Sequence, residues 1–95
     1  MQAVLNAISD PTRRAALALL QGGEECCVCE LMTRLNASQS RMSRHMKMLQ
    51  DAGLVIGRRD AKWVRYRRNR DLAPEFAAVI DAVLAAERPL EEDMA

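Results

Sequence analysis

Three cysteines lie within four consecutive residues of this chain, at positions 26, 27 and 29. Three thiolates cannot complete the four-coordinate site that zinc prefers, and the chain has a single histidine, His45, much further along. Thiolates favour soft ions, and trivalent arsenic or antimony binds three sulfurs as a pyramid with a lone pair in the fourth direction. Cys26, Cys27 and Cys29 are therefore candidate ligands for such an ion. Buried structural thiols and a redox switch through a disulfide are the alternatives.

Basic residues are concentrated in the middle of the chain. The segment 34–70 holds eleven Lys or Arg and two acidic residues, a net charge of +9, whereas the rest of the chain carries −8. One basic face on a small domain suits a polyanion, and the phosphate backbone of DNA is the usual one. The alternative is a solvated basic surface with no partner.

The order of the elements follows from caps, breakers and periodicity. Asp10 before Pro11 and Ser38 mark helix starts, while Gly22 and Gly53 mark helix ends. We expect helices at 1–8, 11–20, 27–35 and 39–52, strands at 54–59 and 62–68 joined at Asp60-Ala61, and a last helix from Pro74 that ends before Pro89. This order, mainly α with a small β-hairpin, is that of a winged helix-turn-helix domain.

The expected helix at 39–52 is the candidate reader of DNA. Its inward face is formed by Met42, Met46 and Leu49. The remaining polar side chains suit base edges or phosphates, with Arg44 fitted to guanine and Gln39 to adenine. The candidate DNA-binding residues of this helix are Gln39, Ser40, Ser43, Arg44 and Lys47. The alternative is an ordinary amphipathic surface helix.

The expected hairpin is the candidate wing. Arg58, Arg59 and Lys62 cluster near its tip, where contacts to phosphate or to the minor groove are expected. His45 lies between the core face and the polar face of the reader helix. It is expected as a satisfied flanking residue, with a DNA contact as the alternative.

The last helix carries a wider apolar stripe than one small core needs. We therefore expect it to pair with the same helix of a second chain, which gives a twofold homodimer that reads two half-sites of double-stranded operator DNA. The candidate dimer-interface residues are Phe76, Val79, Ile80, Val83 and Leu84. The alternative is that this helix folds back on its own domain.

Length and composition bound the remaining classes. A chain of 95 residues is expected to form one domain over 1–95, with an acidic and disordered tail at about 89–95. It has no apolar run that could span a membrane and no signal peptide, so we expect a cytoplasmic protein with three free thiols and no membrane partner. Paired carboxylates, a catalytic triad and a phosphate loop are not visible, which argues against an enzyme.

Several of these segments together resemble the arsenic-responsive repressors of the ArsR/SmtB family. The resemblance covers roughly residues 4–84 and is most specific at the cysteines. It rests on Ser9-Asp10-Pro11-Thr12-Arg13, Cys27-Val28-Cys29-Glu30-Leu31, Ser40-Arg41-Met42-Ser43-Arg44-His45-Met46, Gly53-Leu54 and Lys62-Trp63-Val64-Arg65-Tyr66-Arg67. It implies an apo dimer that blocks an arsenic-resistance promoter and leaves the DNA on binding As(III) or Sb(III).

The chain departs from the family at the third thiolate. The best-known members carry a further cysteine where this chain has Met32, and Cys26 precedes the pair instead. Cys27 and Cys29 therefore transfer directly, and Cys26 is the expected third ligand. A two-thiolate site is the alternative, and it would favour a methylated arsenical with two open valences. The zinc-sensing branch uses acid and His ligands on its last helix, where this chain has Asp81 but no His.

The spacing of the cysteine pair also suggests a mechanism. Residues i and i+2 of a helix point in nearly opposite directions. If Cys27 and Cys29 both lie in regular helix, ion binding must unwind its first turn. Because that helix supports the reader helix, the distortion would reduce DNA affinity. The redox alternative predicts release by peroxide without arsenic.

Overall fold

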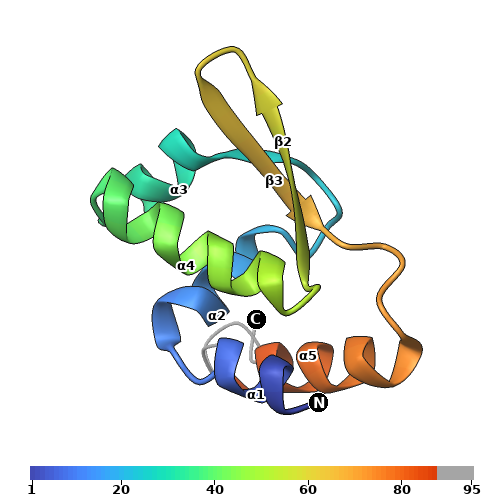
Figure 1. The fold of residues 1–95 in the computed structure, drawn as a ribbon. Helices are drawn as coiled ribbons and strands as arrows, with labels where there is room; N and C mark the ends of the chain where they lie inside the picture. Colours follow the sequence, from blue (N-terminus) through green and yellow to red (C-terminus); the bar gives the residue numbers. More distant parts are fainter. Residues whose placement is uncertain (88–95) are drawn as a thin grey trace.

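The chain forms a bundle of short helices from which a long hairpin projects (Figure 1). The computed structural model describes residues 1–87, so the expected acidic tail at 89–95 lies outside the described residues. The elements are α1 (Gln2–Ala7), α2 (Pro11–Leu19), β1 (Cys26–Cys27), α3 (Val28–Leu35), α4 (Gln39–Asp51), β2 (Val55–Asp60), β3 (Trp63–Arg68) and α5 (Pro74–Ala86). The five helices and the hairpin match the expected order.

Side-chain caps fix where the central helices begin. The Asp10 carboxylate accepts a hydrogen bond from the backbone N–H of Arg13 at 3.0 Å, and the Ser38 hydroxyl accepts one from Arg41 N–H at 3.3 Å. Between α3 and α4, Asn36 adopts the left-handed conformation with φ of 54°, a conformation that Asn tolerates well. This residue turns the chain sharply, so α3 and α4 pack against each other as a helix-turn-helix.

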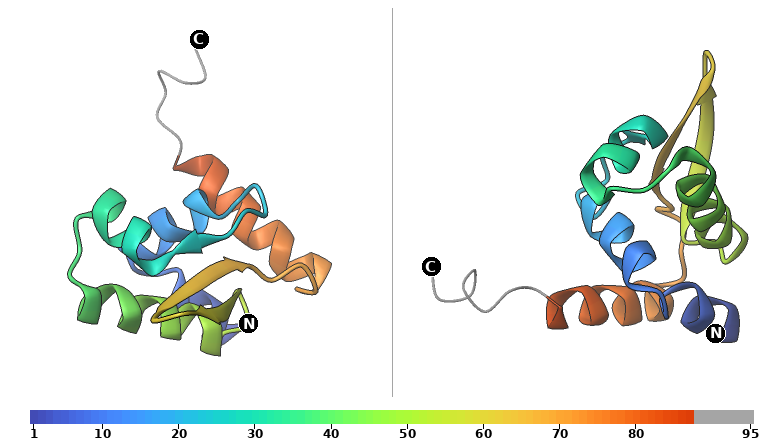
Figure 2. Two further views of the ribbon diagram at one scale, coloured as in Figure 1. Left: turned by 90° about the horizontal axis from the view of Figure 1, so that it is seen from above. Right: turned by 90° about the vertical axis from the view of Figure 1, so that its left-hand side faces the viewer.

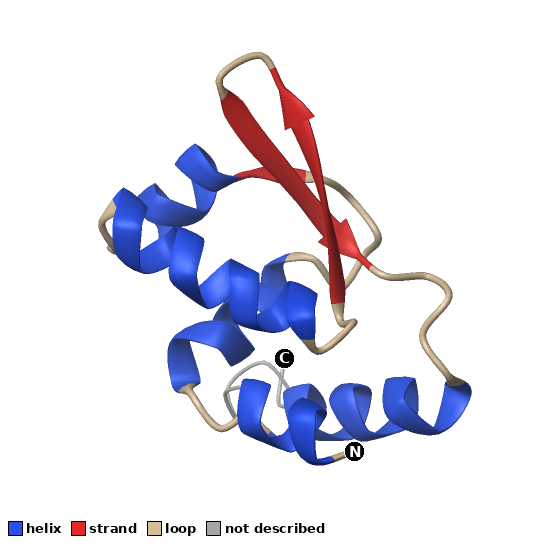
Figure 3. Cartoon of the chain, in the orientation of Figure 1, coloured by secondary structure: helices blue, strands red, loops and turns tan. Residues whose placement is uncertain are grey.

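The sheet has three strands in the order β1-β3-β2, and both pairings are antiparallel. The hairpin β2–β3 extends beyond the helices (Figure 3). Its two-residue turn is Ala61-Lys62, because Asp60 still pairs with Trp63. The expected connection at Asp60-Ala61 is thus displaced by one residue, and Ala61 turns the chain with φ of 57°. Lys62 belongs to the turn and not to the strand.

Strand β1 was not expected from the sequence. Cys26 pairs with Tyr66 and Cys27 with Arg65, so the cysteine segment forms an edge of the wing sheet. The expected helix at 27–35 begins one residue later, at Val28. The cysteines therefore lie at the junction between the sheet and α3.

The core joins all the helices to the base of the hairpin. Met42, Met46 and Leu49 of α4 are fully buried, as their spacing predicts. In Figures 1 and 2, α5 lies on the side of the molecule opposite the hairpin tip. Its Ile80 and Leu84 are buried in the chain's own core. Among residues 1–87, no helix is both long and apolar enough to cross a membrane.

Candidate nucleic-acid interface and cysteine site

Helix α4 presents a polar face whose orientation is set by its buried side. Met42, Met46 and Leu49 anchor the helix in the core, which leaves the side chains on the other side exposed. Of the expected DNA-binding residues on this helix, Ser43 is half-buried, and the exposed ones are Gln39, Ser40, Arg44 and Lys47. Lys47 contacts Asp51 one turn on at 3.4 Å, an exposed pair that is weak and easily exchanged for a phosphate contact.

The hairpin places its expected contacts at or near its tip. Arg58, Arg59 and Lys62 are all exposed. Arg58 is engaged by Glu25, which accepts hydrogen bonds from its Nε at 3.0 Å and its Nη2 at 2.7 Å. Because β2 also packs against α4, the reader helix and the wing form one connected unit.

His45 of α4 is the satisfied flanking residue that the sequence predicts. The buried Arg13 of α2 lies with its Nη1 at 3.1 Å from His45 Nδ1, and an arginine can only donate, so this ring nitrogen accepts. Arg13 also donates from Nε to the carbonyl oxygen of Ala7 at 2.6 Å. One buried guanidinium thereby ties the end of α1 to the reader helix. The Ser-Asp-Pro-Thr-Arg run had indicated a helix cap but not this link.

Cys27 and Cys29 are brought together by the start of α3. Cys27 is the N-cap residue, with extended backbone angles of φ −66° and ψ 145°, and its Sγ accepts a hydrogen bond from Cys29 N–H at 3.3 Å. Their Cα atoms are 5.2 Å apart and their sulfurs are joined as a disulfide. Cys27 is buried and Cys29 is half-buried, so the pair lies at the edge of the core, next to the surface.

This geometry corrects two expectations. Cys27 and Cys29 are not free thiols in this structure, because the cap brings both sulfurs to one place. The premise behind the expected unwinding of α3, that Cys27 and Cys29 both lie in regular helix, is also not met. Since Cys27 stands outside the helix, the two sulfurs approach each other without any distortion of a helical turn.

Cys26 does not join the pair. Successive side chains of a strand point to opposite faces, and Cys26 and Cys27 are successive residues of β1. Cys26 is a buried free thiol, and burial, with the nearby charge of Glu30, raises its pKa. In the part of the chain that the structure describes, no three His, Cys, Asp or Glu side chains gather as a metal site. The structure therefore does not assemble the expected three-sulfur site of Cys26, Cys27 and Cys29.

The expected dimer face on α5 divides into two sets. Ile80 and Leu84 face the chain's own core, so part of the stripe folds back on its domain. Phe76, Val79 and Val83 are only half-buried and leave apolar surface on the same helix. A single chain does not test the pairing, and these three residues are the part of the predicted interface still open to a partner.

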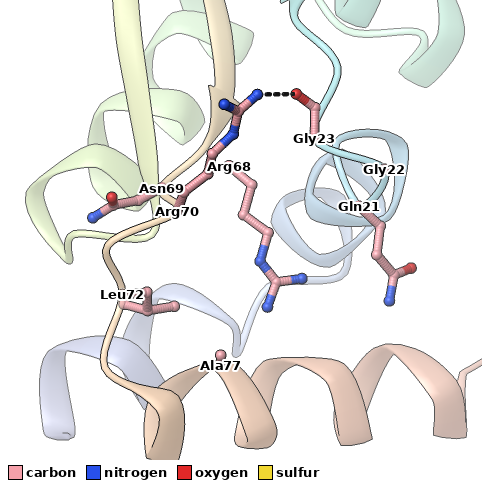
Figure 4. A pocket seen from close by; sticks show the side chains of 8 residues that line it. All are labelled: Gln21, Gly22, Gly23, Arg68, Asn69, Arg70, Leu72 and Ala77. Atoms are coloured by element: carbon pink, nitrogen blue, oxygen red, sulfur yellow. Dashed lines mark hydrogen bonds between the residues drawn. The ribbon is translucent and has the colours of Figure 1, made fainter.

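One pocket of 330 Å³ lies apart from both candidate sites. It is lined by the turn after α2, the end of β3 and the start of α5 (Figure 4). Arg70 donates to the carbonyl oxygen of Gly23 at 3.5 Å, and Arg68 pairs with Asp81 at 2.6 Å. None of the cysteines and none of the expected DNA-binding residues lines it.

The chain is similar to known arsenic regulators. A family model described as "Bacterial regulatory protein, arsR family" matches residues 10–56, from the cap of α2 into β2. The chain is 40% identical over 83 residues to the arsenic resistance transcriptional regulator ArsR2 of Pseudomonas putida, covering 87% of this chain and 72% of that protein. It is 37% identical over 81 residues to the arsenical resistance operon repressor of Escherichia coli K12, covering 85% and 69% respectively.

Solved structures show the same fold. The reduced HlyU of Vibrio cholerae matches with a TM-score of 0.76 and 31% identity, over 92% of this chain and 87% of that one. A homodimeric winged helix-turn-helix DNA-binding domain from Mycobacterium bovis matches with a TM-score of 0.73 and 25% identity, over 90% and 75%. The prediction of a winged helix-turn-helix fold is confirmed.

Proposed function

Because the chain belongs to the ArsR family of bacterial regulatory proteins, we propose that it represses an arsenic-resistance operon and leaves the operator when a trivalent metalloid binds Cys27 and Cys29. Its relatives and structural neighbours are transcriptional regulators, so the chain is a DNA-binding regulator and not an enzyme. The metalloid and its ligands are the parts that this proposal adds.

The observation that carries the proposal is the convergence of two sulfurs at the cap of α3. Reduced to thiols, Cys27 and Cys29 would displace two hydroxyls from trivalent arsenic and release two molecules of water. The N-terminal end of a helix favours negative charge, which supports the thiolate forms that bind the ion. Both residues sit where the sheet and α3 meet, next to the wing.

Two sulfurs favour a ligand with two open valences. Methylarsonous acid has two exchangeable hydroxyls and would be saturated by Cys27 and Cys29. Inorganic As(III) or Sb(III) would keep one hydroxyl, because Cys26 lies on the other face of β1 and the burial that raises its pKa disfavours its thiolate. The proposed site is therefore the pair, with a methylated arsenical as the ligand that fits it best.

The DNA-binding part of the proposal uses the exposed face of α4 and the tip of the hairpin. We place Arg44 and Gln39 against base edges in the major groove, and Lys47 with the wing residues Arg59 and Lys62 against the backbone. A homodimer built on the half-buried residues of α5 would present two such units to two half-sites of operator DNA.

A redox-responsive repressor is the second candidate. The specific observation that favours it is the disulfide between Cys27 and Cys29. In that case the two thiols would lose two electrons and two protons to an oxidant such as peroxide. The oxidised chain, and not an arsenical complex, would leave the DNA.

One titration separates the two candidates. The protein, kept under reducing conditions, is bound to fluorescent DNA from its own promoter, and anisotropy is followed as As(III), methylarsonous acid or Zn(II) is added. The proposal expects release by the arsenicals and no response to Zn(II). A parallel sample is freed of reductant and treated with peroxide. Release by peroxide there, together with retention under both arsenicals, would replace the metalloid function with the redox one.

A further inference from the structure

The register of the sheet aligns the cysteine pair with two wing arginines. Cys27 of β1 pairs with Arg65 of β3, and Arg65 pairs with Arg58 of β2. Directly paired residues project to the same face of a sheet, so these three residues form one row across it. The neighbouring row, Cys26 with Tyr66 and Gly57, projects to the opposite face.

Glu25 links the cysteine end of this row to Arg58 at its other end. It precedes β1 and lies two residues before Cys27. In extended chain, residues two apart project to the same face, so Glu25 lies on the face of the row and can reach β2. Both of its carboxylate oxygens accept hydrogen bonds from Arg58, at 2.7 and 3.0 Å. Bidentate arginine–carboxylate pairs fix direction as well as distance. This pair thus ties the cysteine segment to the far strand of the wing, across β3.

The ionisation of the two groups agrees with a real pair. The hydrogen bond with Arg58 lowers the pKa of Glu25, and the nearby charges of Arg65 and Arg67 act in the same direction. The hydrogen bond with Glu25 raises the pKa of Arg58.

We propose that Glu25 and Arg58 are positioning residues, a latch that transmits a change at the Cys27–Cys29 pair to the wing. This inference rests on the proposed function and specifies how that site is coupled to DNA. An arsenic atom bound between the two sulfurs holds them further apart than a disulfide does. It also fixes their relative positions, which two free thiols do not. Since Cys27 caps α3 and is also paired with Arg65 in the sheet, a shift of its sulfur enters β1 and then the wing.

The latch also decides what Arg58 offers to DNA. Two of the five guanidinium N–H donors of Arg58 are directed at Glu25, and the carboxylate offsets its charge locally. Arg58 was expected to contact phosphate or the minor groove directly. In this account it holds the wing in its DNA-binding position, and Arg59 and Lys62 make the contacts at or near the tip.

The test compares Glu25→Gln with Glu24→Gln, a neighbouring exposed acid that makes the same change in net charge. Promoter DNA affinity is measured by anisotropy with and without methylarsonous acid, and free thiols are counted to confirm that the arsenical binds each variant. If the arsenical lowers the DNA affinity of the wild type and of Glu24→Gln about a hundredfold, it is expected to lower that of Glu25→Gln only about tenfold. Glu25→Gln is expected to bind the arsenical as before.

A second readout separates a latch from mere structural support. Arg58 freed from Glu25 can bind phosphate, so the salt dependence of DNA binding by Glu25→Gln should steepen by about one counterion relative to Glu24→Gln. Equal release and equal salt slopes in the two variants would overturn the latch and leave the metalloid function standing. Failure of the arsenical to release the wild type would overturn the proposed function, and the latch with it.

Discussion

Asp10 combines two contacts at the start of α2. Its carboxylate caps the helix through Arg13 N–H at 3.0 Å and lies 3.9 Å from His45 Nδ1 on the reader helix. Partial burial acts to raise its pKa, but the hydrogen bond from the Arg13 amide and the charge of Arg13 outweigh this and hold the pKa below its usual value. The ionised form is therefore the one that the folded chain prefers.

Removing this cap should lower stability in a pH-dependent way. Asp10→Ala is expected to reduce the free energy of unfolding at pH 7 by about 1 kcal/mol, and Asp10→Asn, which keeps a capping oxygen, by less. Because the pKa is depressed in the folded state, the charge-dependent part is present above the ordinary carboxyl range and is lost as pH falls through the folded value. Urea unfolding of the wild type and of Asp10→Asn at pH 7 and pH 3 checks this. A difference in the free energy of unfolding between the two proteins that grew toward pH 3 would contradict it.

Gly57 shows how tightly the wing is packed at its base. A Cβ at this position would lie 3.0 Å from Cε1 of the buried Tyr66 ring, which has little room to shift. Gly57→Ala should lower the free energy of unfolding by about 1–3 kcal/mol through overpacking. Gly22→Ala, which meets nothing within 4 Å, is the matched control. Urea unfolding curves that coincide for both variants would show that the ring gives way.

At the scale of elements, α4 and the wing should differ in what they contribute to DNA binding. Arg44→Ala is expected to cost about 1–3 kcal/mol on specific DNA and little on random DNA, because it removes a base contact. Lys47→Ala should weaken both alike and reduce the salt slope by about one. Anisotropy titrations on the two DNAs at several salt concentrations test this. If Arg44→Ala lost as much affinity for random DNA as for specific DNA, Arg44 would contact the phosphate backbone and not a base edge.

The elements could be predicted from local sequence wherever a helix or strand had a cap residue or a clear apolar spacing on one side. Caps such as Ser38 and the apolar spacing of α4 placed the helices within one or two residues. Strand β1 escaped because it has two residues and exists only through pairing with β3, far along the chain. The pairing of Glu25 with Arg58 spans 33 positions and left no local signal.

The cysteine site was predictable in composition but not in geometry. The Cys-Val-Cys spacing predicted that Cys27 and Cys29 act together, and the structure brings their sulfurs together. The metalloid chemistry that the resemblance to the ArsR family implies stays a prediction. Cysteine is an uncommon helix cap, so no local signal placed Cys27 outside α3. Cys26 was expected as a third ligand because it is adjacent in sequence, yet the alternation of β1 turns it to the other face.

For the whole molecule, assembly is expected to rest on α5. Phe76, Val79 and Val83 leave apolar surface on this helix, on the side of the molecule away from the wing. Val79→Glu should convert a dimer into monomers in sedimentation velocity and weaken operator binding at least about tenfold, because the two half-sites are no longer linked. Ala82→Glu, at an exposed position of the same helix, is the control. A Val79→Glu protein with native circular dichroism that stayed dimeric would place the interface elsewhere.

The central claim is that Cys27 and Cys29, without Cys26, hold the metalloid that releases the DNA. The most direct test is release of promoter DNA by methylarsonous acid, under reducing conditions, from Cys26→Ser, Cys27→Ser and Cys29→Ser. The account predicts that Cys26→Ser is released at the same concentration as the wild type and that the other two variants stay bound. Retention by Cys26→Ser, or release of Cys29→Ser, would contradict it.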